Sequence, residues 1–279
     1  MFSNFIYYIV VLLIYSTYQP SEKTNFGGLE TLFLFVALIA VFSGITRLRF
    51  RRIERQILKQ SPFRLDHKFR SALTHQSIMA ILLFSIDIYG LNLTSFLIEI
   101  PFLSVIPTFQ ALLFIILFTG YLAIIWACAY DPYQRLYATD LSRKTYILSQ
   151  ISISVPILLP WFLLSGILDI INALPFDLPK RLLSTTEGEI IYFMVFLLAI
   201  AIIGPAMIQK FWRCKPLEMG EHRRRIEELC KKAGLGYHNI LYWPVFGGRM
   251  ITAAVMGLIK KFRYILVTHG LLDMLEPEE

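Results

Sequence analysis

The sequence is poor in charged residues. Asp, Glu, Lys and Arg account for 17% of its 279 residues, whereas about 25% is usual in soluble globular chains. Hydrophobic residues account for 56%. A chain of this composition needs an apolar solvent as well as water, and lipid is that solvent. The shortage of charge therefore argues against an ordinary soluble protein and predicts an integral membrane protein.

Cysteines are also few, and glycine-rich phosphate loops of the Walker or dinucleotide type are absent. The three cysteines, Cys128, Cys214 and Cys230, show neither the spacing of a metal site nor an even number for pairing. Cys128 lies in an apolar run, and the charge distribution places the other two in the cytosol. We therefore expect three free, reduced thiols.

Long apolar runs are what the sequence has in abundance. A helix needs roughly 20 apolar residues to cross a bilayer, because an unpaired backbone polar group is costly in hydrocarbon. Pro156 and Pro160 are expected to kink the fifth of the predicted spans. Between the third and fourth spans, Leu91–Thr108 is interrupted by Pro101 and Pro107, which predicts an interfacial or re-entrant loop. The six predicted spans are Phe2–Tyr18, Leu29–Ile45, Ala72–Tyr89, Phe109–Tyr130, Ile147–Ile171 and Glu189–Ile208.

The basic residues are distributed unevenly between the two sides of these spans. Nine lie in Arg47–Arg70, three in Asp131–Tyr146 and twelve from Lys210 onward, which makes 24 on one side. The opposite side has only three. Because Lys and Arg gather on the cytosolic side, we expect a multi-pass plasma (inner) membrane protein with both termini cytosolic. The basic loop 47–70 would face anionic headgroups.

The same distribution argues against nucleic acid as a partner. A formal net charge of +7 is compatible with nucleic-acid binding, but the basic residues lie where membrane topology requires them. The lipid bilayer is the predicted partner, and a basic groove for nucleic acid is a remote alternative.

The composition predicts two domains, a six-helix transmembrane region at 1–209 and a cytosolic domain at 210–279. In the second, Leu217–Ala233 has helical spacing and Gly234 is a left-handed cap after it. Three short apolar runs separated by turn residues predict an antiparallel meander, followed by a helical turn. The runs are Asn239–Val245, Arg249–Gly257 and Tyr264–Thr268, and the turn is His269–Leu275.

The cytosolic domain is expected to be incomplete. Glu276-Pro277-Glu278-Glu279 has the pattern of a helix start, and no helix follows it in the sequence. Three strands and one helix are also too small a unit to bury a core. A partner chain that supplies the missing helices is possible on this interpretation, and a frayed acidic terminus is the alternative.

The pieces from Pro216 to Glu279, taken in order, resemble a known family. The helix Glu221–Leu229, the strand Thr252–Leu258 and the stretch Ile265–Glu279 are similar to the HtpX-like and CAAX prenyl endopeptidase-like membrane zinc metallopeptidases. The resemblance implies a polytopic α-helical membrane protein with a partial cytosolic α+β metallopeptidase domain. It also implies zinc in the intact family member and hydrolysis of polypeptide substrates at the cytosolic face.

Within the resemblance, the strand around Thr252–Gly257 would pair with an extended peptide substrate. Ala253 and Gly257 match the family pattern Asn-Ala-x-x-x-Gly and are the predicted substrate-binding residues. Thr252 stands where the family has Asn, which puts the anchoring of the strand in question.

The zinc motif of the family, His-Glu-x-x-His, does not occur in the sequence. That motif places two imidazoles on one helix face, with the Glu as general base. No two of the five histidines are spaced in this way, and three arginines follow the nearest imitation, Glu221-His222. We therefore expect no catalytic residue, no metal ligand and no bound zinc in this chain. The histidines are His67, His75, His222, His238 and His269.

Four ionisable residues lie near the ends of the apolar segments: His75, Asp87, Glu99 and Asp169. Ionisable groups inside a membrane often mark functional sites, but a group near an interface reaches water at little cost.

The sequence as a whole leaves two functional hypotheses. The chain is either the N-terminal anchoring portion of a membrane zinc metalloendopeptidase, inactive alone, or a non-catalytic membrane scaffold or transporter-like subunit.

Overall fold

The computed structural model consists of two compact units, Met1–Pro175 and Phe176–Glu279. Its described residues are 3–19, 26–57, 62–98, 106–137, 139, 141–175, 177–244 and 251–274. The second unit begins before the composition boundary at 209/210, because the last long apolar helix belongs to the same compact unit as the sheet.

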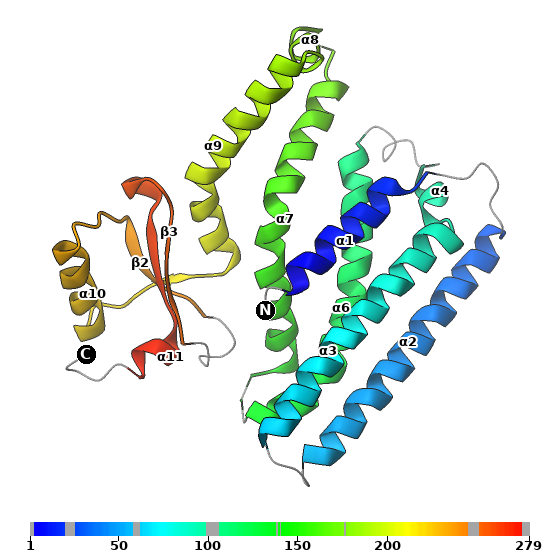
Figure 1. Ribbon diagram of the computed structural model, residues 1–279, viewed down its shortest axis with the longest axis horizontal. Helices are drawn as coiled ribbons and strands as arrows, with labels where there is room; N and C mark the ends of the chain where they lie inside the picture. Colours follow the sequence, from blue (N-terminus) through cyan, green and yellow to red (C-terminus); the bar gives the residue numbers. More distant parts are fainter. Residues whose placement is uncertain are drawn as a thin grey trace. The chain divides into compact units, whose positions relative to one another are not determined.

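The first unit is a bundle of helices around a central helix, α6 (Figure 1). Helix α6 packs against α1, α2, α3 and α7. A π-helical turn, η1, continues α3. The elements are α1 (Ser3–Thr17), α2 (Gly28–Ile57), α3 (Pro62–Ser85), η1 (Ile86–Gly90), α4 (Leu93–Ile98), α6 (Pro107–Tyr137) and α7 (Arg143–Ala173).

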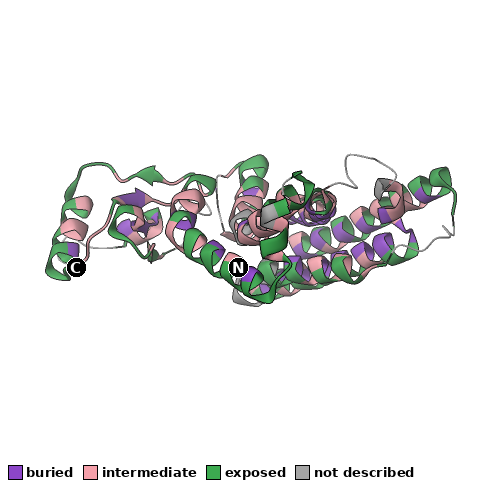
Figure 2. Ribbon diagram, turned by 90° about the horizontal axis from the view of Figure 1, so that it is seen from above, coloured by how far each residue is buried: buried purple, intermediate pink, exposed green. Residues whose placement is uncertain are grey.

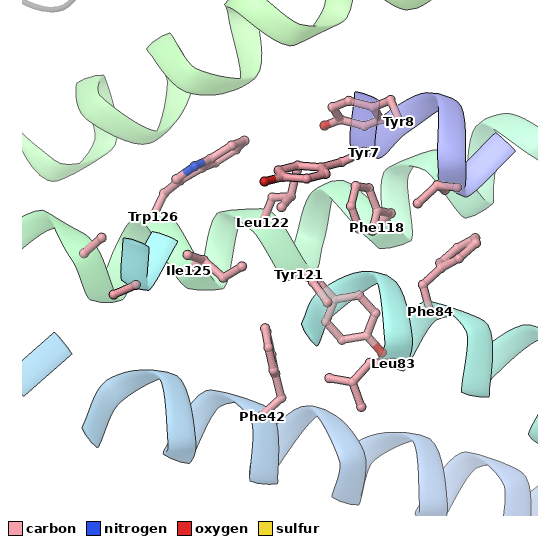
Figure 3. Close-up of a cluster of buried hydrophobic side chains, with 14 of the residues drawn as sticks. Tyr7, Tyr8, Phe42, Leu83, Phe84, Phe118, Tyr121, Leu122, Ile125 and Trp126 are labelled. Atoms are coloured by element: carbon pink, nitrogen blue, oxygen red, sulfur yellow. The ribbon is translucent and has the colours of Figure 1, made fainter. Parts of the chain in front are cut away.

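Aromatic side chains on α6 form the centre of this bundle (Figure 3). The ring of Tyr121 meets Phe42 of α2 edge-to-face, with centroids 5.6 Å apart. One turn earlier, the ring of Phe118 meets Tyr8 of α1 at 5.5 Å in the same geometry. Such pairs add to the packing that holds helices together where the surroundings are also apolar.

Four described helical segments are long and apolar enough to cross a membrane: Gly28–Ile57, Leu65–Gly90, Pro107–Tyr137 and Thr186–Phe211. In α7, the arms Arg143–Ile153 and Leu158–Ala173 meet at 60° and make a fifth span if the pair is counted as one. The bend falls where the sequence has Pro156, in agreement with the predicted kink. The first predicted span coincides with α1, which is apolar but shorter than the other spans.

The basic segment 47–70, predicted as a cytosolic loop between two spans, is mostly helical. Helix α2 continues to Ile57 and α3 begins at Pro62. Arg is a good helix former, and α2 therefore extends beyond its apolar part without a break. Arg135 of α6 pairs with Glu54 of α2 at 2.9 Å in this region.

The interrupted segment Leu91–Thr108 contains a short helix, α4, before the undescribed residues 99–105. Pro107 is the first residue of α6, as expected for a residue that lacks an N–H. The backbone N–H of Thr108 donates to Asp169 Oδ2 at 2.7 Å, so this carboxylate caps the start of α6.

The second unit is a four-stranded sheet with helices on it. Its strand order is β1-β2-β4-β3. Buried residues alternate with exposed and half-buried ones along the long helices in Figure 2. The elements are α8 (Asp177–Leu183), α9 (Thr186–Phe211), β1 (Lys215–Pro216), α10 (Glu221–Lys232), β2 (Asn239–Tyr242), β3 (Ala253–Met256), η3 (Lys260–Phe262), β4 (Tyr264–Val267) and α11 (His269–Leu272).

The predicted antiparallel meander is wrong, although the positions of its three strands are confirmed. Strand β4 lies between β2 and β3, parallel to β2 and antiparallel to β3. Every residue of β4 is buried, and this apolar run therefore takes the central place, where both its faces are covered. Strand β1, which precedes α10, adds to the open side of β2.

Helices cover both faces of β4. On one face Ile265 and Val267 pack with residues of α10 and α11. On the other, Leu266 packs in a cluster with Ala206 of α9 and with Trp212, which follows it. The expectation that this sheet lacks a cover is therefore wrong for β4. Strand β3 is the exception, since its side chains alternate between exposed and half-buried.

The predicted helical cap at Gly234 is confirmed. Gly234 has φ +63°, and its N–H donates to the carbonyl of Lys231 at 3.2 Å. The N–H of Leu235 donates to the carbonyl of Cys230 at 2.8 Å. These two bonds make a Schellman motif, which ends α10 and directs the chain toward β2.

Candidate functional site

Among the described residues, strand β3 is an edge strand: it pairs with β4 on one side and with no other strand on its outer side. The N–H of Thr268 donates to the carbonyl of Thr252 at 3.2 Å. This bond shows which residues of β3 direct their N–H and C=O groups toward β4 in the antiparallel ladder. Bonded and non-bonded pairs alternate in such a ladder. The N–H and C=O groups of Ala253 and Val255 therefore point away from β4, toward the open edge. This edge can accept one more extended strand.

The side chains of β3 divide between the two faces of the sheet. Ala254 and Met256 pack into the cluster with Trp212. Ala253 and Val255 are exposed on the opposite face, Val255 by 57%. A peptide added to this edge would therefore meet a small and a β-branched side chain, neither of which obstructs backbone pairing.

Thr252 stands where the family pattern has Asn, and the side chain of Thr268 anchors the backbone at this position. The fully buried hydroxyl of Thr268 accepts from the Thr252 N–H at 3.0 Å and donates to its carbonyl at 3.0 Å. The start of β3 is thus held by a side chain of the neighbouring strand. In this chain, Thr268 provides an anchor for the strand from outside the pattern Asn-Ala-x-x-x-Gly.

Gly257 ends β3 in a conformation that requires glycine. Its φ is +114°, and a Cβ at this position would lie far inside van der Waals contact with the carbonyl oxygen of Phe262. The Gly257 carbonyl accepts from Arg263 Nε at 3.2 Å. The structure therefore gives Gly257 a role in the turn, and its contact with a substrate stays a prediction, as does that of Ala253.

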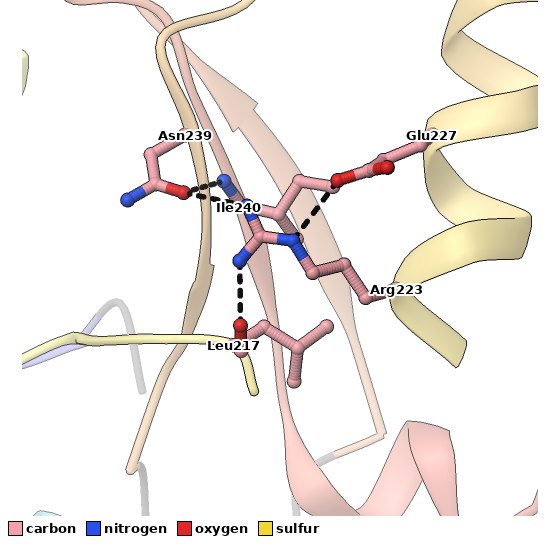
Figure 4. Close-up of polar contacts among 5 residues, drawn as sticks. All are labelled: Leu217, Arg223, Glu227, Asn239 and Ile240. Atoms are coloured by element: carbon pink, nitrogen blue, oxygen red, sulfur yellow. Dashed lines mark hydrogen bonds and ion pairs between the residues drawn. The ribbon is translucent and has the colours of Figure 1, made fainter. Parts of the chain in front are cut away.

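Two arginines that the sequence reasoning did not single out organise the sheet. Arg223 of α10 donates to Glu227 Oε1 at 2.9 Å, to the Leu217 carbonyl at 2.5 Å and to Asn239 Oδ1 at 3.2 Å (Figure 4). It thereby joins α10, the segment after β1 and the start of β2. Its only sequence signal is a basic residue on the half-buried side of an amphipathic helix.

Arg263, directly before β4, also joins separate backbone segments. Its guanidinium donates to three backbone carbonyls, those of Gly257 (3.2 Å), Leu258 (2.6 Å) and Gly236 (2.9 Å). Nothing in the sequence distinguishes Arg263 from the neighbouring lysines, because its role depends on carbonyls that only the folded chain brings together.

The described residues do not fit a zinc ion. They contain no group of three His, Cys, Asp or Glu side chains able to hold a metal. His222 is exposed on α10, as predicted. His238 lies edge-on to the ring of Tyr264, with centroids 5.4 Å apart, and exposed His269 is 3.6 Å from Asp273.

Cys214 is not poised for metal binding or nucleophilic attack. The residue packs in the cluster of Leu241, Tyr264 and Leu266. Burial raises the pKa of its thiol to about 12, so the thiolate that binds metals is scarce at neutral pH. All three cysteines are free thiols in the structure, as expected from their number and spacing.

The four ionisable candidates near the ends of the apolar segments differ in their surroundings. Asp87 is fully buried in η1 and accepts a hydrogen bond from the Tyr121 hydroxyl at 2.6 Å. Asp169 caps α6 and also lines a cavity of about 670 Å³ among α1, α6 and α7. His75 is exposed, and its Nδ1 donates to the Ser71 carbonyl at 2.7 Å. Glu99 lies outside the described residues.

Within the described residues, the fold and these sites define an apolar helical bundle and a small mixed sheet with β3 at one of its edges. No protein-family model matches the chain, and neither a curated protein nor a solved structure matches it.

Proposed function

We propose that this chain is the membrane-anchoring and peptide-binding portion of an integral-membrane zinc metalloendopeptidase that acts at the cytosolic face. The observation that carries the proposal is the open edge of β3, where the N–H and C=O groups of Ala253 and Val255 point away from the sheet. The edge lies within the segment that resembles the zinc metallopeptidases, at the strand that the resemblance assigns to substrate.

The proposal assigns no catalytic step to this chain. His-Glu-x-x-His is absent from the sequence, and the described side chains do not fit zinc. What the residues present do is bind and orient. An extended polypeptide would pair its backbone with Ala253 and Val255, while Thr268 holds the start of the strand and Arg263 holds its end.

The membrane part of the proposal is a six-span topology with both termini in the cytosol. It is supported by the helices that are long and apolar enough to cross a membrane and by the 24-to-3 distribution of basic residues. Cysteine-accessibility mapping from either side of sealed vesicles tests it. Labelling of position 219 from the outside only would contradict a cytosolic sheet.

Peptide pairing is tested by removing one outward-pointing donor from β3. Val255→Pro deletes the N–H that faces the open edge and leaves the ladder with β4 intact, a placement that an edge strand tolerates. Val255→Thr is the matched control, because it keeps the N–H and the β-branched shape. The probe is fluorescently labelled casein, with the purified full chain in detergent micelles.

We expect Val255→Pro to weaken casein binding by about tenfold, as loss of a well-formed polar contact does. Val255→Thr should bind like the parent chain. Equal tryptic digestion patterns of the three proteins establish that the fold is retained. Undiminished binding by a folded Val255→Pro variant would refute the edge-pairing proposal, and chelator-sensitive cleavage of casein would refute the assignment of anchoring and binding alone.

A non-catalytic transporter-like function is the second candidate, and buried Asp87 is the observation that favours it. Its carboxylate lies within an apolar helical segment, in a π-helical turn of a kind often found at functional sites. Proton flux into liposomes containing the full chain distinguishes the two functions. Flux that Asp87→Asn abolishes supports transport, and equal flux in protein-free liposomes rejects it.

A further inference from the structure

The turn between β3 and β4 presents apolar and cationic side chains together. We call Gly257–Arg263 the hairpin tip. Leu258 and Ile259 are 67% and 44% exposed, and Lys260 and Lys261 beside them are exposed as well. In the part of the chain that the structure describes, neither lysine forms an ion pair. Adjacent exposed apolar and basic residues are typical of segments that lie at a membrane surface.

The hairpin tip has a defined conformation. Arg263 donates hydrogen bonds to the carbonyls of Gly257, Leu258 and Gly236, and these three bonds hold the backbone of the tip in place. The N–H of Phe262 donates to the Ile259 carbonyl at 2.9 Å. A ligand that meets this tip therefore meets a surface that is already ordered, and little conformational entropy is lost on docking.

The two lysine side chains are exposed, whereas the guanidinium of Arg263 is engaged by three backbone carbonyls. The methylene stem of Lys260 lies over Gly236, where an added Cβ would come within 2.8 Å of the lysine Cδ. A lysine stem of this kind can cover apolar surface while its charge stays in a polar layer.

The hairpin tip packs against α9, and the direction of the strands shows toward which part of that helix it lies. Trp212, directly after α9, stacks on Trp243 with centroids 4.4 Å apart, and Trp243 follows the carboxyl end of β2. Strand β4 is parallel to β2, so its first residue and the tip before it lie at the opposite end of the strands. The 3-10 turn η3 within the tip packs against α9 itself.

The tip is thus displaced from the end of α9 toward the apolar part of that helix. Four strand residues span about 13 Å, which corresponds to about nine residues of helix. Thr186–Phe211 is one of the segments long and apolar enough to cross a membrane. The tip therefore packs beside a helix that is long and apolar enough to cross a membrane, toward the end at which that helix would leave the bilayer.

We infer that the hairpin tip docks into the surface of an anionic lipid bilayer, with Leu258 and Ile259 in the acyl boundary and Lys260 and Lys261 on phosphate groups. The occupant is lipid because the tip packs against a helix that is long and apolar enough to cross a membrane and carries charge complementary to anionic headgroups. Docking of this kind would hold β3 at a fixed depth. The inference goes beyond the proposed peptidase function and does not depend on it.

The test measures the depth of the tip with an environment-sensitive dye. A bimane is attached to Leu258→Cys in the full chain, with the three native cysteines replaced by alanine, in nanodiscs of phosphatidylcholine with about 30% phosphatidylglycerol. Met219→Cys is the control, because Met219 is 85% exposed in the same unit but lies away from the hairpin. We expect nitroxide lipids to quench the dye at position 258 strongly and the dye at 219 weakly.

Charge is tested by Lys260→Gln and Lys261→Gln, which keep most of each side-chain stem. Each is expected to reduce quenching at position 258 by up to about fivefold in anionic discs, and to change little in discs of phosphatidylcholine alone. Lys231→Gln and Lys232→Gln on α10 are the matched controls. Equal quenching at 258 and 219 would overturn the inference. Quenching at 258 that casein displaces, or that requires two chains per disc, would overturn it too and identify a peptide or a second copy as the occupant.

A measurement on the unmodified chain guards against misfolding of the cysteine-free protein. Trypsin should cut after Lys260 and Lys261 about tenfold more slowly in anionic discs than in neutral discs, as expected for two charges bound at the surface. Cleavage after Lys231 and Lys232 should be the same in both. Equal cleavage of the hairpin tip in the two kinds of disc would contradict docking on anionic lipid.

Discussion

The hydroxyl of Thr268 holds both backbone groups of Thr252. It accepts from the Thr252 N–H and donates to the Thr252 carbonyl, each at 3.0 Å. A single buried side chain, that of the residue directly after β4, thereby holds the backbone at the point where β3 begins. The phase of the open edge, and with it the proposed peptide-binding surface, depends on this contact.

Replacement of Thr268 by Val should loosen the start of β3. Valine has the shape of threonine but removes the hydroxyl that binds the half-buried N–H and the carbonyl of Thr252, which costs about 1 kcal/mol. Thr268→Ser, which keeps the oxygen, should cost less. Hydrogen exchange of the β3 amides is the measurement, and unchanged protection in Thr268→Val would contradict the anchoring role.

Replacement of Gly257 by Ala should destabilise the hairpin. The backbone has φ +114° there and a methyl group would collide with the Phe262 carbonyl, so a cost of about 2 kcal/mol or more is expected. Gly120→Ala is the control, because an added Cβ at this α6 position meets nothing within 4 Å. Thermal unfolding in detergent gives both values, and equal melting temperatures would show that the turn adapts.

Replacement of Arg223 by Lys should weaken the junction between α10 and the sheet. A single ammonium does not reproduce the fork that reaches Glu227, Leu217 and Asn239, so a loss of about 1–3 kcal/mol is expected. Arg224→Lys is the matched control on the same helix, since the Arg224 side chain is 71% exposed and its pairs are long. Comparable losses in the two variants would show that the three buried contacts contribute little.

The reactivity of Cys214 should have an unusual pH dependence. Burial raises the pKa of this thiol to about 12, whereas an unfolded thiol titrates near about 8.5. In a variant with Cys128 and Cys230 replaced by alanine, alkylation by iodoacetamide should keep accelerating up to about pH 11. The same variant unfolded in guanidinium should reach its plateau near about pH 9. An early plateau in the folded protein would contradict burial of the thiol.

The same shift predicts alkaline sensitivity of the second unit. A thiol whose folded pKa is raised favours the folded state while it stays protonated. As pH rises above the unfolded pKa, the unfolded chain loses its proton first, so stability falls between about pH 9 and 12. Cys214→Ala should remove this component of the pH dependence, as followed by the fluorescence of Trp212 and Trp243, and an identical pH profile would count against it.

Much of the secondary structure follows from local sequence. Runs of apolar residues long enough for a bilayer predict the long helices, Gly234 predicts the end of α10, and three short apolar runs predict the positions of β2, β3 and β4. Each of these features depends on residues close together in the chain, where periodicity and backbone preference act directly. The resemblance to zinc metallopeptidases adds a hypothesis for Ala253 and Gly257, and their contact with substrate stays a prediction.

The arrangement of those elements was decided by the tertiary structure. An alternating or apolar pattern is the same in parallel and antiparallel strands, so the sequence by itself did not place β4 between β2 and β3. The cover of β4 by α9, the anchoring of Thr252 by Thr268 and the bonds from Arg263 all join residues that are distant in sequence. Such contacts depend on which surfaces bury most completely together, and that is a property of the whole folded unit.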